Sequence, residues 1–228
     1  MSQIDSKLAS ASMRGLLRRC HRDAGPDIAR SSGLFGLFID PYDDEGFVVD
    51  APNLHTRLRL SRRGEGFAGD LRCAESAMPV ADDSFALIFL NCAFEVARDP
   101  VGLAAECARM LESEGTLLVL GLNPWSPAHL RWMFGGLRAW SPEATSALLS
   151  GLGLEVAGWR YLGARWSTKP AVTIDLAGAR PLGSPLRSGF LLEARRRDPG
   201  MIPLRVQKSR VQFAGGARAG SARIRVAR

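Results

Sequence analysis

Cysteine and histidine are scarce in this chain of 228 residues, which contains four cysteines and three histidines. The cysteines are widely spaced, with no Cys-x-x-Cys pair and no histidine at metal-ligand spacing: Cys20, Cys73, Cys92 and Cys107. This pattern argues against a zinc site and against a disulfide framework. We therefore predict no metal site and expect the thiols to be reduced and buried.

Long apolar runs are also missing. No window approaches the roughly 18 apolar residues of a membrane-spanning helix, and the N-terminus has no apolar region of the roughly 7–15 residues of a secretory signal. We interpret the chain as a cytoplasmic protein that does not enter a membrane. Its Ser- and Arg-rich start is faintly typical of a transit peptide, but Asp5 and Asp23 favour an amphipathic helical segment over residues 1–30, with an apolar face of Ile4, Leu8, Leu16, Leu17 and Cys20.

Acidic residues are almost absent from the end of the chain. Residues 195–228 contain ten Lys or Arg and one Asp, a net charge of +9, whereas the whole chain carries +7. With few large apolar side chains, residues 206–228 are predicted to form a disordered basic tail. Residues 195–228 could bind nucleic-acid phosphate; the alternative is a solvated extension that keeps the protein soluble.

An alternation of strands and helices is present in the middle of the chain. Residues 85–91, "FALIFLN", are a continuous apolar run that predicts a strand buried on both faces. A helix should follow, with Asp99 as N-cap, Pro100 in the first turn and Gly115 ending it in the left-handed conformation. A second buried strand over 115–123 completes a βαβ unit.

The remaining pattern predicts helices at 127–137 and 142–150, the second capped by Ser141, and a strand beginning at residue 154. A Gly- and Pro-rich turn over 178–189 leads to "FLLEARRR", which is expected to return as the antiparallel partner of that strand. Alternating strands and helices closed by an antiparallel pair predict an α/β fold with a mostly parallel sheet.

A series of short motifs follows the middle of the chain: Met78-Pro79-Val80, Asp82-Asp83, Ser84-Phe85-Ala86, the segment from Glu95 to Pro100, Glu106, and Arg109 to Gly115. In their order and spacing these motifs resemble the class I S-adenosylmethionine (SAM) dependent methyltransferases of the type 11 group. The segments "GLNPWSPAHLRW" and "RPLGSPLRSGFLLEARRR" resemble a bacterial subgroup of small methyltransferases with a basic tail and an abbreviated first motif. The resemblance implies a Rossmann-like methyltransferase domain over residues 31–205.

The resemblance also implies a SAM site outside the carboxyl ends of the strands, at the switch point of the sheet. It places Ile39 and Asp40 at the methionine end of the cofactor. The adenine rim is expected at Ala74, Glu75 and Ser76, and Asn91 and Cys92 are expected to face the transferred methyl group. On the acceptor side we expect Asn123, Pro124 and Trp125, for which a plain structural turn is the alternative. Glu106 and Arg109 are interpreted as a solvated ion pair rather than as catalytic groups.

Three features of the cofactor site depart from the group. The loop after the first predicted strand, residues 33–40, has no Gly-x-Gly, and residues 41–53 are too few for a full crossover helix. The acid expected on the ribose hydroxyls is absent after the second strand, where Arg62 and Arg63 stand; Asp40, Asp43 or Glu45 could replace it. Ala74 holds the position of the adenine-binding Asp, with Glu75 next to it.

Two functions therefore stay open. One is a SAM-dependent methyltransferase with an atypical cofactor pocket, whose acceptor is a small molecule, RNA or protein. The other is a methyltransferase-fold protein that has lost SAM turnover and acts as a binding or scaffold module, with RNA contacted through its tail.

Overall fold

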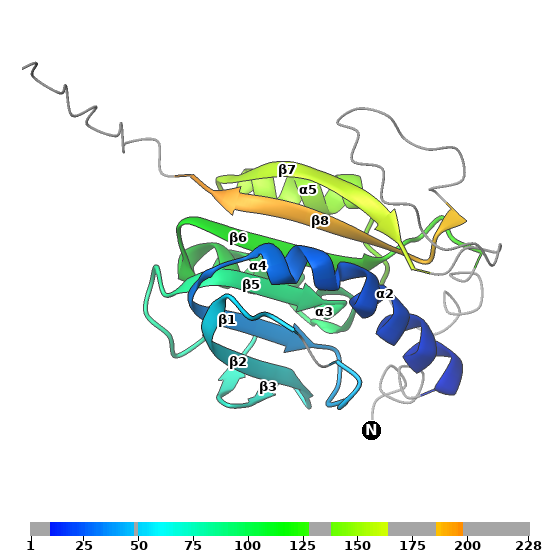
Figure 1. Cartoon of the computed structure of the whole chain (residues 1–228), viewed down its shortest axis with the longest axis horizontal. Coiled ribbons are helices and arrows are strands. Elements are labelled where there is room, and N and C mark those ends of the chain that lie inside the picture. Colours follow the sequence, from blue (N-terminus) through cyan, green and yellow to red (C-terminus); the bar gives the residue numbers. More distant parts are fainter. Residues whose placement is uncertain (1–9, 48–49, 128–137, 164–185, 198–228) are drawn as a thin grey trace, which may run out of the picture. The chain divides into compact units, whose positions relative to one another are not determined.

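A mixed β-sheet organises the chain (Figure 1). The computed structural model describes residues 10–47, 50–127, 138–163 and 186–197. Within these ranges eight strands are hydrogen-bonded in the order β4-β3-β2-β1-β5-β6-β8-β7. The strands are β1 Gly33–Asp40, β2 Leu54–Arg63, β3 Gly66–Gly69, β4 Arg72–Ala74, β5 Phe85–Asn91, β6 Leu111–Leu122, β7 Leu154–Leu162 and β8 Gly189–Arg196.

The helices of the described ranges are α2 Ala11–Arg30, α3 Ala93–Val96, α4 Pro100–Met110 and α5 Pro142–Gly151. The helix predicted over 127–137, most of the turn over 178–189 and the tail over 206–228 lie outside those ranges, and the domain boundaries at 30 and 205 stay predictions. No helix in the described part of the chain is long and apolar enough to cross a membrane.

The α/β fold class is confirmed. Strands β2, β1, β5 and β6 are mutually parallel, and β8 is antiparallel both to β6 and to β7. The predicted hairpin partner therefore enters the sheet between the two strands that precede it in the sequence. The parallel strands need cover on both faces, because crossover connections place helices there.

Two apolar layers supply this cover, and β5 is buried over its whole length. On one face, alternate residues such as Phe38 and Phe89 pack with Met13 and Leu17 of α2. On the other face, residues such as Ile88 pack with the side chains of α4 and α5. The period of two residues along each strand explains why neighbouring apolar residues serve opposite layers.

The predicted amphipathic helix near the N-terminus corresponds to α2. Ser10 caps it, and Leu17 and Cys20 lie on its buried face as expected, while Leu16 is half-buried. Ile4 and Leu8 of the predicted face lie outside the described residues. The buried face makes this helix part of the main core.

The helix after β5 begins as predicted, because the Asp99 carboxylate accepts a hydrogen bond from the Gly102 N–H at 2.9 Å. Its predicted end is wrong. The helix stops at Met110, β6 begins directly at Leu111, and the left-handed residue is Glu114, with φ of 63°, rather than Gly115. The β3–β4 hairpin was not predicted, since its strands are only four and three residues long.

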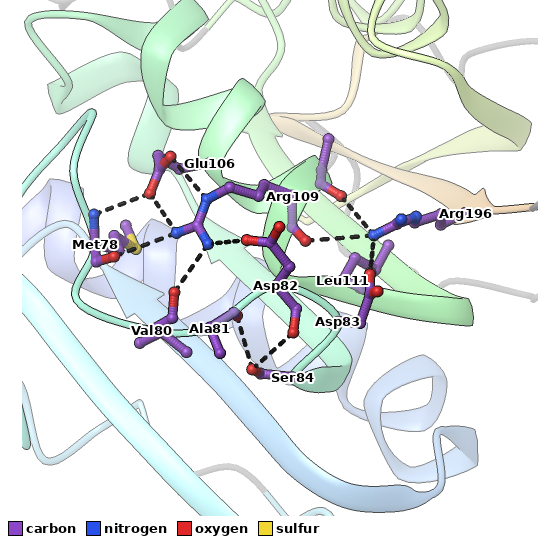
Figure 2. Close-up of polar contacts among 11 residues, drawn as sticks. Met78, Val80, Ala81, Asp82, Asp83, Ser84, Glu106, Arg109, Leu111 and Arg196 are labelled. Atoms are coloured by element: carbon purple, nitrogen blue, oxygen red, sulfur yellow. Dashed lines mark hydrogen bonds and ion pairs between the residues drawn. The ribbon is translucent and has the colours of Figure 1, made fainter.

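The predicted ion pair of Glu106 and Arg109, three residues apart on α4, is present, but it is half-buried rather than solvated (Figure 2). Arg109 Nη1 donates to the Val80 carbonyl at 2.9 Å and Nη2 to the Met78 carbonyl at 3.2 Å. Glu106 Oε2 accepts from Arg109 at 2.8 Å and from the Met78 N–H at 2.9 Å. The pair therefore fixes the segment that leads into β5, which gives both residues a structural role.

Candidate functional site at the switch point of the sheet

The site lies where β1 and β5 end side by side. The chain leaves β1 toward β2 on one side of the sheet and leaves β5 toward β6 on the other, so this is the switch point at which α/β sheets bind ligands. Asp40 is the last residue of β1 and Asn91 the last of β5. The Asn91 side-chain amide donates to Asp40 Oδ1 at 2.8 Å, which joins the two predicted residues across the switch point.

Asp40 is a carboxylic acid that is almost completely buried, with 2% of its surface exposed. Its Oδ2 accepts from Arg59 Nη2 at 3.1 Å. Burial raises the pKa of Asp40 to about 6, although the hydrogen bonds from Asn91 and Arg59 act in the opposite direction. At neutral pH the site therefore holds a carboxylate that a further positive charge would stabilise.

Four buried polar side-chain atoms in the described ranges have no hydrogen-bond partner: His21 Nε2, Tyr42 Oη, Arg59 Nε and Asn91 Oδ1. Two of them belong to Asn91 and Arg59, which contact Asp40 directly. The other two belong to His21 and Tyr42, whose rings each lie 5.3 Å from the ring of Phe47 in the segment after β1. Buried polar atoms are normally paired, so such a concentration marks a place where a ligand or water is expected to complete the hydrogen bonds.

The segment after β1 covers this edge of the sheet. Phe47 is fully buried and packs between His21 and Tyr42. Asp44 anchors the segment to α2, because its carboxylate accepts from Arg18 Nη2 at 2.6 Å and Nε at 3.2 Å, and from the Gly46 N–H at 2.7 Å. As predicted, the described residues of this connection contain no helix.

Ile39 and Cys92 lie inside the core next to this pair. Ile39 is fully buried in the layer on the α4 side. Cys92 adopts a left-handed conformation with φ of 48°, donates its backbone N–H to the Leu120 carbonyl at 2.7 Å, and is 1% exposed. Burial raises the pKa of its thiol well above the ordinary value, so Cys92 is a neutral core group rather than a nucleophile.

The residues predicted for the adenine rim differ in their exposure to solvent. Ala74 and Ser76 are exposed at the end of β4, whereas Glu75 is 5% exposed. The Glu75 carboxylate pairs with Arg62 and accepts from the backbone N–H groups of Arg98 and Asp99, each at 2.8 Å. Both oxygens are thus already used to hold the connection between α3 and α4.

The residues predicted for the acceptor side follow β6. Asn123 is fully buried, and its side chain donates to the Arg187 carbonyl at 2.7 Å and accepts from the Trp125 N–H at 3.0 Å. This is a hydrogen-bonded turn, the structural alternative for this residue. Pro124 is half-buried, while Trp125 is 71% exposed and offers an apolar ring to solvent beside the carboxyl end of the sheet.

Sequence reasoning missed Arg59, His21 and Tyr42. Arg59 belongs to the alternation Arg57, Arg59, Ser61, Arg63 along β2, which signals one polar face of that strand. His21 comes from α2, far from the site in sequence, so no local pattern could have nominated it. Glu95 was noted only as part of a motif; its Oε1 accepts from the Leu122 N–H at 2.7 Å, and burial raises its pKa to about 7.

Solved structures with the same architecture define the class of fold. The protein crystallised with the Trm112 methyltransferase activator of Haloferax volcanii is 17% identical, with a TM-score of 0.53 over 86% of this chain and 96% of that chain. The YcgJ protein of Bacillus subtilis is 16% identical, with a TM-score of 0.53 over 78% and 99%. A SAM-dependent methyltransferase of Thermotoga maritima is 14% identical, with a TM-score of 0.52 over 86% and 98%.

This chain therefore has the Rossmann-like fold of class I methyltransferases. A family model described as a methyltransferase domain matches residues 42–119, from the segment after β1 into β6. The resemblance inferred from the motifs between residues 78 and 119 is thereby confirmed. No curated protein sequence matches the chain.

Proposed function

We propose that the protein is a SAM-dependent methyltransferase whose cofactor enters at the switch point between β1 and β5. The observation that carries the proposal is the pairing of Asp40 with Asn91 at that point, with Asn91 Oδ1 buried and lacking a partner among the described residues. The match to a methyltransferase domain supports the same reaction class.

The pair of Asp40 and Asn91 suits the amino-acid half of SAM. The amino-acid end of SAM carries an ammonium group with three N–H donors, and its sulfonium is also cationic. The Asp40 carboxylate and the free lone pairs of Asn91 Oδ1 are acceptors suited to that ammonium group, which would also stabilise the ionised form of Asp40. Ile39 and Cys92 supply apolar walls beside them.

The nucleoside half fits less well. Arginine side chains, Arg59 and Arg62, stand along β2 where the resemblance leads us to expect an acid, and both oxygens of Glu75 are engaged. This leaves Ala74 and Ser76, exposed at the end of β4, as the candidates for the adenine rim. The fit therefore rests on the methionine end of the cofactor.

Little catalytic machinery is needed for this reaction, because bound SAM supplies a methyl group that is already electrophilic. The task of the chain is to hold the acceptor in line and to exclude water. The exposed ring of Trp125, next to the turn at Asn123 and Pro124, is our candidate for acceptor contact. The acceptor itself is left open.

Titration calorimetry with S-adenosylhomocysteine tests the proposal, because this product analogue retains the ammonium group and needs no acceptor. We expect a dissociation constant of about 100 μM or tighter, weakened at least about tenfold by Asp40→Asn, which removes one charge-assisted contact. Glu155→Gln is the control, since Glu155 lies on β7, away from the switch point, and is an exposed acid paired with exposed Arg197. Equal affinities of the two variants would contradict the placement of the methionine end.

The same contact predicts a pH dependence of binding. Since the pKa of Asp40 is raised to about 6, affinity for the ammonium group should be constant above that value and should fall below it as the carboxyl becomes protonated. Calorimetry at pH 7.5 and pH 5 compares the two states, and an affinity unchanged between them would speak against Asp40 as the ammonium partner.

A second candidate is a methyltransferase-fold binding protein that no longer uses SAM. The observation that favours it is the segment directly after β1, where Phe47 is fully buried against His21 and Tyr42 and no Gly-x-Gly is present. Absence of heat and of any thermal shift with millimolar S-adenosylhomocysteine would select this candidate.

A cytoplasmic location and nucleic-acid binding through residues 195–228 are further parts of the proposal. The first arginines of this segment are engaged with the domain: Arg196 Nη1 donates to the Leu111 carbonyl at 2.7 Å, and Arg197 pairs with Glu155 at 3.0 Å. We therefore assign any phosphate binding by this segment to the basic residues after 198. Their replacement should weaken RNA binding and leave thermal stability unchanged.

A further inference from the structure

A cavity of about 650 Å³ lies beside the switch point, on the outer part of the sheet. Its walls come from the polar face of β2, from β3 and from the residues that follow them. They are lined mainly by charged side chains: Asp40, Asp43, Arg57, Arg59, Arg63, Asp70 and Arg72, with Leu60, Ser61, Ala68 and Gly69. The volume is in the range that small-molecule sites occupy.

The connections around β2 explain why this face of the sheet is open. The segment between β1 and β2 has no helix among its described residues. Strand β2 turns directly into β3 through Gly64 and Glu65, and Gly64 has a φ of 62° that suits such a tight turn. In Figure 1, α2 crosses the central strands and β2 and β3 lie to one side of it. No crossover helix therefore fills the space above them.

The charges of the cavity favour an anion. Four arginines face three aspartates, and two of those aspartates are already paired, Asp40 with Arg59 and Asp43 with Arg63. The third, Asp70, accepts from the Arg59 backbone N–H at 2.7 Å. Arg72 is exposed and forms no ion pair with any described residue.

Arg59 provides an independent observation. Its Nη2 contacts Asp40, but its Nε is buried and lacks a hydrogen-bond acceptor within the described part of the chain. A guanidinium group presents its Nε and one Nη as a fork that matches two oxygens of a phosphate. The unmatched Nε thus belongs to a guanidinium group that lines the cavity together with three other arginines.

We propose that this cavity binds a phosphate-bearing small molecule of about mononucleotide size. The phosphate lies between Arg59 and the arginines of β2 and β4, Arg57 and Arg72. Hydroxyl or amino groups of the ligand donate to the aspartates at the rim, Asp43 and Asp70. The proposal does not depend on methyl transfer, although Asp40, our candidate for the ammonium group of SAM, lines one part of the cavity.

The test uses the full-length protein and two probes, inorganic pyrophosphate and AMP, with adenosine as the phosphate-free comparison. We expect calorimetric binding of both phosphate probes at about 1 mM or tighter and no binding of adenosine. The double variant Arg57→Gln/Arg72→Gln should weaken both phosphate probes by about tenfold, since it removes two charge-assisted donors.

The matched control is Arg30→Gln/Arg98→Gln, which makes the same change of net charge at two exposed arginines outside the cavity lining. We expect it to bind the phosphate probes like the unmodified protein, and circular dichroism should show the same fold for both double variants. Arg59→Lys retains the charge but removes the fork, so it should weaken pyrophosphate binding while Arg195→Lys does not.

Three results would overturn the proposal. One is the absence of binding by either phosphate probe. Another is an equal loss of binding in the control variant and the cavity variant, which would mean that net charge rather than the cavity holds the phosphate. The last is binding that S-adenosylhomocysteine abolishes and both double variants retain, which would place the probes in the cofactor site.

Discussion

Replacement of Asp40 by Asn should make the folded protein more stable at neutral pH, although it weakens S-adenosylhomocysteine binding. Asp40 is buried at the end of β1, between the amide of Asn91 and the guanidinium of Arg59. Asn has the same shape and can still accept the hydrogen bond from Asn91. It carries no charge that must be held away from water.

The size of the effect follows from the pKa. Burial raises the pKa of Asp40 from an ordinary 3.8 to about 6, so the folded state disfavours the ionised form. The resulting loss of stability grows as the pH rises from 3.8 through about 6 and is complete above it, where it corresponds to about 3 kcal/mol. At pH 5 the loss is about half as large.

Urea unfolding followed by tryptophan fluorescence measures this difference. At pH 8 the free energy of unfolding of Asp40→Asn should exceed that of the unmodified protein by up to about 3 kcal/mol. At pH 5 this difference should be roughly half as large. The difference between the two proteins cancels the titration of groups elsewhere in the chain. Asp43→Asn, at an exposed carboxylate, should change stability by less than about 0.5 kcal/mol at either pH.

Two results would refute the reasoning. The first is an Asp40→Asn variant that is less stable than the unmodified protein at pH 8, which would mean that the Arg59 contact outweighs the cost of burial. The second is an excess that stays constant between pH 5 and pH 8, which would mean that Asp40 titrates near its ordinary pKa.

Two further substitutions test the packing of the segments that precede β5 and follow β1. Arg109→Ala should lower the free energy of unfolding by about 2–3 kcal/mol, because it leaves two carbonyls and Glu106 without their cation; chemical denaturation checks this, and a loss no larger than that of Arg195→Ala, at an exposed pair, would contradict it. Phe47→Ala should cost about 3–5 kcal/mol through the cavity it leaves. Because it also loosens the segment that follows Asp40, it should tighten S-adenosylhomocysteine binding in calorimetry below its melting temperature. Weaker binding would show that the cofactor requires this packing.

Local patterns were sufficient for the central elements. The apolar run 85–91 predicted β5, and Asp99 with Pro100 predicted the start of α4, because strand burial and helix capping are set by neighbouring residues. The end of that helix was misplaced because Gly115 is a strong stop signal on its own. In the fold, β6 pairs with β5 from Leu111 onward, and this pairing ends the helix four residues earlier.

Only part of the candidate site could be predicted from the sequence. Asp40 and Asn91 were nominated because residues at the carboxyl ends of parallel strands meet at one edge of a sheet. Glu75 was expected at the adenine rim, and its use by Arg62 and two backbone N–H groups depended on contacts with β2 and α4 that no sequence window contains.

The sequence by itself determined that the chain is an α/β protein with a buried parallel core and a shortened connection after the first strand. Hydrophobic period, caps and segment length act between residues close in the chain. Only the tertiary structure decided that Phe47 packs between His21 and Tyr42, that Asn91 and Arg59 meet at Asp40, and that the arginines of β2 line an open cavity. Those outcomes depend on which segments, far apart in the sequence, pack against each other. The burial of a charge or of an unpaired polar atom is decided by that packing.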